Sequence, residues 1–140
     1  MSALRIPAAL AEAIRAHGRE TYPHECCGFL IGTVDANDVT IVNEVIRAGN
    51  TRDDSPNNRY AIDPKELQAI DLDAGKRKMG VVGIYHSHPD VAARPSEFDR
   101  EHACPWYCYA IVSIVKGQSQ ELLNWKLDDN DKFVEDPILD

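Results

Sequence analysis

Apolar side chains recur along this chain with two different periods, and each period predicts a type of element. Near the N-terminus, Leu10, Ala11 and Ile14 follow the spacing of one helix face. The run from Cys27 to Ile31 is continuously apolar, as in a buried strand. The same reasoning predicts helices at residues 7–20, 64–74 and 95–103, and strands at residues 27–32, 39–46, 59–62, 81–88, 107–115 and 121–127.

Proline and capping residues mark the expected ends of these elements. Pro23 ends the first helix, because proline disfavours a helical residue before it. Asp63 and Pro64 offer an N-cap and a first helical residue for the next helix. Helices and strands alternate irregularly, which predicts an α/β (α+β) domain at residues 1–127 with helices packed against a sheet. The acidic residues 128–140 are expected to form a loosely held, flexible tail.

Charge and composition restrict the partners and the location that we expect. A chain of 140 residues with a net charge of −8 is unsuited to binding nucleic acid, which requires concentrated Lys and Arg. The single basic run, at residues 76–78, is expected to be a solvated helix end. No segment resembles a signal peptide or a membrane span, so we expect a cytoplasmic protein without a membrane partner.

Two histidines and an aspartate have the spacing of a metal site. The strand predicted before Pro89 ends with His86 and His88, whose side chains point to the same face with Cα atoms roughly 7 Å apart. Pro89 stops the strand, so the following loop can bring the first turn of the next helix, with Asp99, back to the histidines. The three side chains are of the kind that a catalytic zinc ion needs as ligands, with a fourth position left for water.

Each part of this pattern has a second interpretation. Ser96 and Asp99 also form a helix-capping pair, and Asp99 suits a helix N-terminus without any metal. A hydrolytic zinc site needs a carboxylate that moves protons, and Glu25, at the start of an apolar strand, is a candidate. By itself, however, the sequence around Glu25 favours an ordinary surface carboxylate.

The cysteines allow further alternatives. Four cysteines suit a reducing compartment, where we expect small buried thiols. Cys26 or Cys27 could instead be a nucleophile, and His102, Cys104 and Cys108 could hold a second zinc ion, although no second ligand pair supports it.

Two other features are open to a functional interpretation. Trp106 and Tyr107 could line a substrate groove, although an aromatic pair beside a strand is commonly core. The polar residues 50–58 could form a flap over a substrate or a passive surface loop.

Taken together, these motifs resemble a known family. Over about residues 3–127 the chain is similar to the JAMM (MPN-plus, Mov34/PAD-1) zinc metalloproteases in the kind and spacing of three motifs. These motifs are Glu25 before Cys-Gly-Phe-Leu-Ile-Gly, the sequence His-Ser-His-Pro, and Ser-x-x-Asp. The resemblance implies that His86, His88 and Asp99 bind one zinc ion per chain. It also implies that Glu25 is the general acid/base and that Ser96 helps to hold the oxyanion of the tetrahedral intermediate.

The resemblance also implies a fold and a class of substrate. It implies a curved, mostly antiparallel sheet flanked by helices, the JAB/MPN fold, which is related to that of cytidine deaminase. Members hydrolyse peptide or isopeptide bonds after the C-terminal Gly-Gly of ubiquitin-like proteins. This compact chain has little room for the insertions that grip polyubiquitin, and it looks more like the short prokaryotic members, including the sulfur-carrier (CysO-cysteine) peptidase. We therefore expect a ubiquitin-fold sulfur carrier of the ThiS/MoaD type as substrate.

Three alternatives belong to other function classes. A non-catalytic MPN scaffold would not need the ligands found here, and zinc content would distinguish it. A DNA-linked protein resembling RadC is disfavoured by the acidic charge. A nucleobase deaminase requires Pro-Cys-x-x-Cys, whereas Cys104 and Cys108 are separated by three residues that include Pro105.

Overall fold

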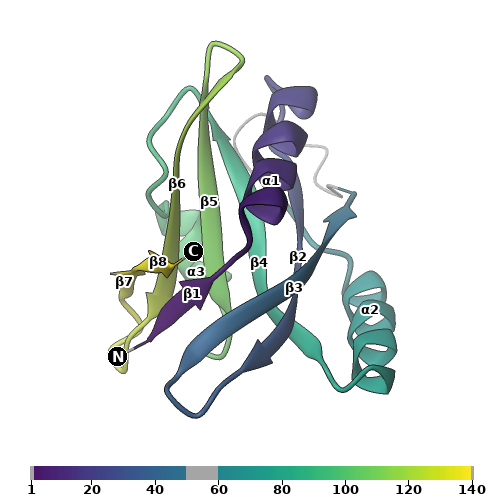
Figure 1. The fold of residues 1–140 in the computed structure, drawn as a ribbon. Helices are drawn as coiled ribbons and strands as arrows, with labels where there is room; N and C mark the ends of the chain where they lie inside the picture. Colours follow the sequence, from purple (N-terminus) through teal and green to yellow (C-terminus); the bar gives the residue numbers. More distant parts are fainter. Residues whose placement is uncertain (1, 50–59, 140) are drawn as a thin grey trace.

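The chain folds around one curved sheet, seen as the long arrows of Figure 1. The computed structural model describes residues 2–49 and 60–139. In these residues no helix is both long and apolar enough to span a membrane. The elements are β1 (Ala3–Arg5), α1 (Ala8–Thr21), β2 (Cys27–Val34), β3 (Val39–Ala48), α2 (Pro64–Lys76), β4 (Gly80–Pro89), α3 (Glu97–Glu101), β5 (Cys108–Val115), β6 (Gln118–Leu127), β7 (Phe133–Asp136) and β8 (Ile138–Leu139).

The strand order is β7-β6-β5-β4-β2-β3-β1-β8. Antiparallel pairs join β2 to β3 and β4, and β6 to β5 and β7. Parallel pairs join β4 to β5, and β1 to β3 and β8. The expectation of a curved, mostly antiparallel sheet flanked by helices is therefore confirmed.

The last two strands bring the ends of the sheet together. β7 and β8 stand at opposite ends of the strand order, yet only Pro137 separates them along the chain. The carbonyl of Pro137 accepts a 2.9 Å hydrogen bond from the Leu4 N–H, and the Ser2 hydroxyl donates to Asp136 at 2.8 Å. The sheet therefore curls into a nearly closed barrel. The segment expected to be a loose tail instead supplies β7 and β8, because the free edges of β6 and β1 offer backbone partners.

The predicted and observed elements differ at three other places. Ala3–Arg5 forms a strand that the apolar pattern did not predict, because three residues are too few to show a period. Residues 60–62 form no strand, and residue 59 lies outside the described residues. The helix expected over residues 95–103 is only Glu97–Glu101, because its N-cap follows Pro95 and the chain turns before Pro105.

Side-chain alternation gives the sheet two different faces. On one face, Tyr85 of β4 packs in a cluster with Ile14 of α1. On the other face, Ile84 of β4 packs in a cluster with Ala74 of α2. His86 and His88 follow Ile84 at intervals of two residues, so they lie on the face that α2 covers.

Candidate metal centre

Strand β4 holds both histidines rigidly. His86 is paired to Cys27 of β2 on one side and to Ile111 of β5 on the other. His88 is paired to Ser113 of β5. The His86 side chain is fully buried and His88 is 6% exposed. The histidines therefore project from an interior strand whose neighbours fix its position.

Helix α3 brings Asp99 to the histidines. The Ser96 hydroxyl accepts a hydrogen bond from the Asp99 N–H at 3.0 Å, and the Ser96 N–H donates to Asp99 Oδ2 at 2.9 Å. This reciprocal capping box fixes the first turn of α3. Oδ2 is also the atom that faces the histidines, so capping and a place in the site are compatible for Asp99.

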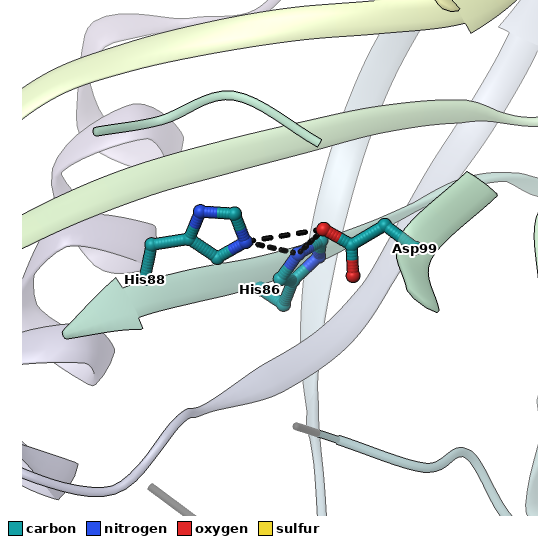
Figure 2. A group of neighbouring side chains, drawn as sticks. All are labelled: His86, His88 and Asp99. Carbon is teal, nitrogen blue, oxygen red and sulfur yellow. Dashed lines mark hydrogen bonds and ion pairs between the residues drawn. The ribbon is translucent and has the colours of Figure 1, made fainter. Parts of the chain in front are cut away.

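Three potential ligand atoms converge in this arrangement (Figure 2). The Nε2 atoms of His86 and His88 lie 3.2 Å apart, and Asp99 Oδ2 lies 3.3 Å from the first and 3.1 Å from the second. Ligands 2.0–2.1 Å from a tetrahedral zinc ion are separated by about 3.3 Å. Within the described residues, His86, His88 and Asp99 form the group whose ligand atoms, all within 4.8 Å of one another, could hold a metal ion. Its geometry fits zinc.

The tautomer of His88 also fits a metal ligand. His88 Nδ1 lies 2.9 Å from the carbonyl oxygen of Ala92, which can only accept a hydrogen bond, so Nδ1 carries the proton. In the neutral ring, Nε2 therefore directs a lone pair at the carboxylate of Asp99. Two acceptors at this distance repel one another unless a metal cation or a second proton on the ring lies between them. A metal-binding imidazole usually donates the N–H of its other ring nitrogen to a carbonyl or carboxylate oxygen, which fixes the ring.

The loop that carries Ala92 is fixed to the sheet. The Ser113 hydroxyl donates to the carbonyl of Val91 at 2.6 Å, and the Trp125 indole N–H donates to the carbonyl of Ala93 at 2.9 Å. These bonds on either side of Ala92 fix its carbonyl against His88. No side-chain motif signals this backbone role, so sequence reasoning missed it.

Tyr60 is a second neighbour that sequence reasoning missed. Its ring stacks on His86 with centroids 4.3 Å apart and planes inclined by 25°. The Nδ1 atom of His86 is buried and, in the part of the chain that the structure describes, has no hydrogen-bond partner. Stacking, together with the strand, therefore orients the ring. Nothing in the local sequence indicates this contact, because residues 60 and 86 meet only in the folded chain.

The electrostatics of the centre favour a bound cation. Burial would raise the pKa of Asp99, but hydrogen bonds to His86 and His88 lower it far below its usual value. Burial lowers the pKa of His86. Burial acts in the same direction on His88, but its hydrogen bonds to Asp99 and Ala92 outweigh this and raise its pKa. The centre is thus a buried anion beside two imidazoles, and it is stabilised by positive charge.

Glu25 and Ser96 lie beside this centre. Cys27 of β2 pairs antiparallel with His86, so continuing the register places Glu25 opposite His88 and on the same face. Glu25 is only 4% exposed, so its interpretation as a surface carboxylate is wrong. One pocket is lined by Glu25, His88, Pro89, Val91, Ser96, Glu97 and Phe98.

The cysteine alternatives do not fit the structure. Burial raises the pKa of Cys26 to about 11 and that of Cys27 to about 12, so neither supplies a thiolate near neutral pH. Cys108 is buried in the core on the α1 face. His102, Cys104 and Cys108 do not form a metal-binding group within residues 2–49 and 60–139.

The structure describes the aromatic pair Trp106 and Tyr107 but not the segment considered as a flap. Trp106 is 68% exposed, and Tyr107 lines a pocket next to Asp99. Trp106 is therefore not core, whereas Tyr107 is half-buried and packs against the core cluster on the α2 face. The flap considered at residues 50–58 lies outside the described residues.

Comparison with known families identifies the fold and the relatives of this chain. The family of prokaryotic homologs of the JAB domain matches residues 7–128. The chain belongs to this family. The resemblance to JAB/MPN proteins of the short prokaryotic type is therefore confirmed.

Relatives of this JAB-family chain include proteins named for enzymatic activities. It is 38% identical to a desampylase of Haloferax volcanii over 117 residues, which are 80% of this chain and 81% of that protein. It is 36% identical to the deubiquitinase BRCC36 of Xenopus tropicalis over 89 residues, which are 59% of this chain and 33% of that protein. A solved JAB1/MPN domain protein of Archaeoglobus fulgidus has the same fold, with a TM-score of 0.58, 19% identity and 99% of each chain covered.

Proposed function

We propose that this JAB-family chain is a zinc-dependent hydrolase that cleaves the bond after the C-terminal Gly-Gly of a ubiquitin-fold protein. The observation that carries the proposal is the convergence of His86 Nε2, His88 Nε2 and Asp99 Oδ2 within 3.3 Å of one another. Relatives named as a desampylase and a deubiquitinase support this substrate class. A non-catalytic scaffold would not require such a buried ligand set.

The residues around the centre have distinct tasks in this proposal. His86, His88 and Asp99 would hold the zinc ion, which when bound would supply an activated water and polarise the scissile carbonyl. Glu25, buried beside His88, would take a proton from the attacking water and deliver it to the leaving nitrogen. The Ser96 Oγ accepts the Asp99 N–H, so its own hydrogen can be donated to the carbonyl oxygen of the substrate.

Within this substrate class we propose a small sulfur carrier of the ThiS/MoaD type. Two connections at the centre are short: residues 90–96 join β4 to α3, and residues 102–107 join α3 to β5. Neither connection is long enough to form a separate element that would grip a second ubiquitin. A single carrier whose extended C-terminus reaches the centre suits this compact surface.

Mass spectrometry of a carrier with a short extension after Gly-Gly tests the function. The zinc-reconstituted protein should remove the extension, a chelator should stop the reaction, and added zinc should restore it. A parallel reaction with a ubiquitin fusion serves as the comparison substrate. Cleavage of the ubiquitin fusion alone would contradict the sulfur carrier and keep the hydrolase.

Two results would overturn the function itself. The first is a zinc-loaded protein that cleaves neither substrate. The second is a folded protein that takes up no zinc after reconstitution, because His86, His88 and Asp99 would then not be zinc ligands. Cleavage that persists in chelator would contradict the zinc mechanism.

A further inference from the structure

A second pocket adjoins the metal centre on the side of Asp99. It has a volume of about 250 Å³ and lies between α2, α3 and the start of β5. We call it the aromatic pocket. Its main walls are Tyr60, Ile62, Leu67, Phe98, Tyr107 and Tyr109.

The aromatic pocket is continuous with the site. Asp99 lines it directly, and Tyr60 in its wall stacks on His86. Phe98 lines both the aromatic pocket and the pocket that contains Glu25 and His88. A substrate chain bound across the metal centre would therefore pass the mouth of the aromatic pocket.

The chemistry of the aromatic pocket favours an apolar occupant. Burial raises the pKa values of Tyr107 and Tyr109, so their hydroxyl groups stay uncharged. The Tyr109 oxygen already accepts a hydrogen bond from the Cys104 N–H at 2.6 Å. Pockets for whole small molecules usually measure roughly 300–1,000 Å³, so this smaller space suits one side chain.

The position of Glu25 gives the direction of the substrate. A general acid delivers its proton to the leaving nitrogen, so the leaving group lies on the side of Glu25 and His88. The acyl part of the substrate then extends to the other side, past Asp99. We propose that the aromatic pocket binds an apolar side chain of the carrier's C-terminal segment, upstream of Gly-Gly, and thereby selects the acyl partner. This inference rests on the proposed function and adds a determinant of specificity to it.

A set of peptides on the unaltered chain tests the aromatic pocket. The reference is Ser-Ser-Ser-Gly-Gly linked to an aminocoumarin, and three further peptides carry one Leu in place of each Ser in turn. We expect Leu at one position to raise kcat/KM about tenfold or more, as burial of a leucine side chain would. Equal cleavage of all four peptides would overturn the inference and leave the proposed function intact.

Two leucines of α2 provide a matched pair of variants. Leu67 lines the aromatic pocket, whereas Leu72 is 64% exposed and is not among its lining residues. Leu67→Ala should remove most of the preference for the Leu peptide, and Leu72→Ala should keep it. A preference that survives Leu67→Ala unchanged would contradict the assignment. If Leu67→Ala fails to fold, the peptide series on the unaltered chain decides.

Binding supplies a measurement that does not depend on turnover. The zinc-loaded Glu25→Gln protein is titrated with the same peptides by calorimetry. The Leu peptide preferred in the kinetic series should bind about tenfold more tightly than the all-Ser peptide. Tighter binding without any cleavage by the unaltered protein would contradict the proposed function and retain the aromatic pocket. Equal affinities for all peptides would overturn the aromatic pocket as a specificity site.

Discussion

The two faces of β4 carry different kinds of polar group. Toward α1, the Tyr85 hydroxyl lies 2.7 Å from His17 Nδ1, and the Ser87 Oγ accepts the Cys26 N–H at 2.8 Å. Gly28 has no side chain there, and a Cβ at this position would overlap the Tyr85 ring. On this face each of these polar groups has a partner within the protein.

Toward α2 and α3, the same strand presents His86 and His88. Their Nε2 atoms and Asp99 Oδ2 lie within 3.3 Å of one another, and three mutual hydrogen bonds among them cannot all form. The polar groups of this face therefore do not fully satisfy one another and are suited to binding a ligand, whereas those named on the α1 face have partners within the protein. Because side chains alternate along this buried strand, one face carries groups that stabilise the fold and the other carries groups suited to binding a ligand. Substitutions on the two faces should therefore have different effects.

The largest effect is expected for His88→Ala. Loss of one of three ligands should reduce the zinc content from about one per chain to nearly zero and abolish cleavage. Elemental analysis of the purified protein measures the zinc content. Tyr85→Phe, on the opposite face of the same strand, is the control and should keep its zinc. Unchanged metal content in His88→Ala would exclude His88 as a ligand.

A smaller effect is expected for Glu25→Gln. The amide cannot accept the proton of the attacking water, so kcat should fall by about 10²–10⁴. The zinc content should stay at about one per chain, because Glu25 is not part of the ligand group. Mass spectrometry of reactions quenched at successive times measures the rate of carrier cleavage. Turnover at the unaltered rate would assign the proton transfer to another residue.

The smallest effect concerns His17 on the α1 face. Burial lowers the pKa of His17 to about 4, whereas in the unfolded chain it titrates near 6.5. The unfolded chain therefore binds the proton more readily, and His17 reduces the stability as the pH falls from about 6.5 toward about 4. Between about pH 7.5 and about pH 5 this contribution should amount to about 1–2 kcal/mol.

Urea unfolding of the metal-free protein at these two pH values measures the effect. His17→Gln should lose this part of the pH dependence, so its stability should fall less than that of the unaltered chain. Metal-free protein is used because zinc release on acidification would add a pH dependence of its own. An identical pH dependence in both proteins would show that His17 is not held neutral.

Local features of the sequence were sufficient for much of the fold and for the grouping of His86, His88 and Asp99. Asp63 and Pro64 mark the start of α2, since capping depends on adjacent residues. The two-residue spacing of His86 and His88 places them on one face of β4, because the strand period is local. Pro89 and the Ser96 cap likewise mark the return of the chain to Asp99.

Only the tertiary structure decided which distant segments meet. Glu25 lies beside His88 because β2 pairs antiparallel with β4 in the Cys27–His86 register. Tyr60 likewise reaches His86 only in the folded chain, although a shorter stretch of sequence separates these two residues. The closing strands β7 and β8 and the aromatic pocket depend on the same kind of contact. Strand register and pocket walls arise from pairing and packing between segments far apart in sequence, and no local period encodes these partners.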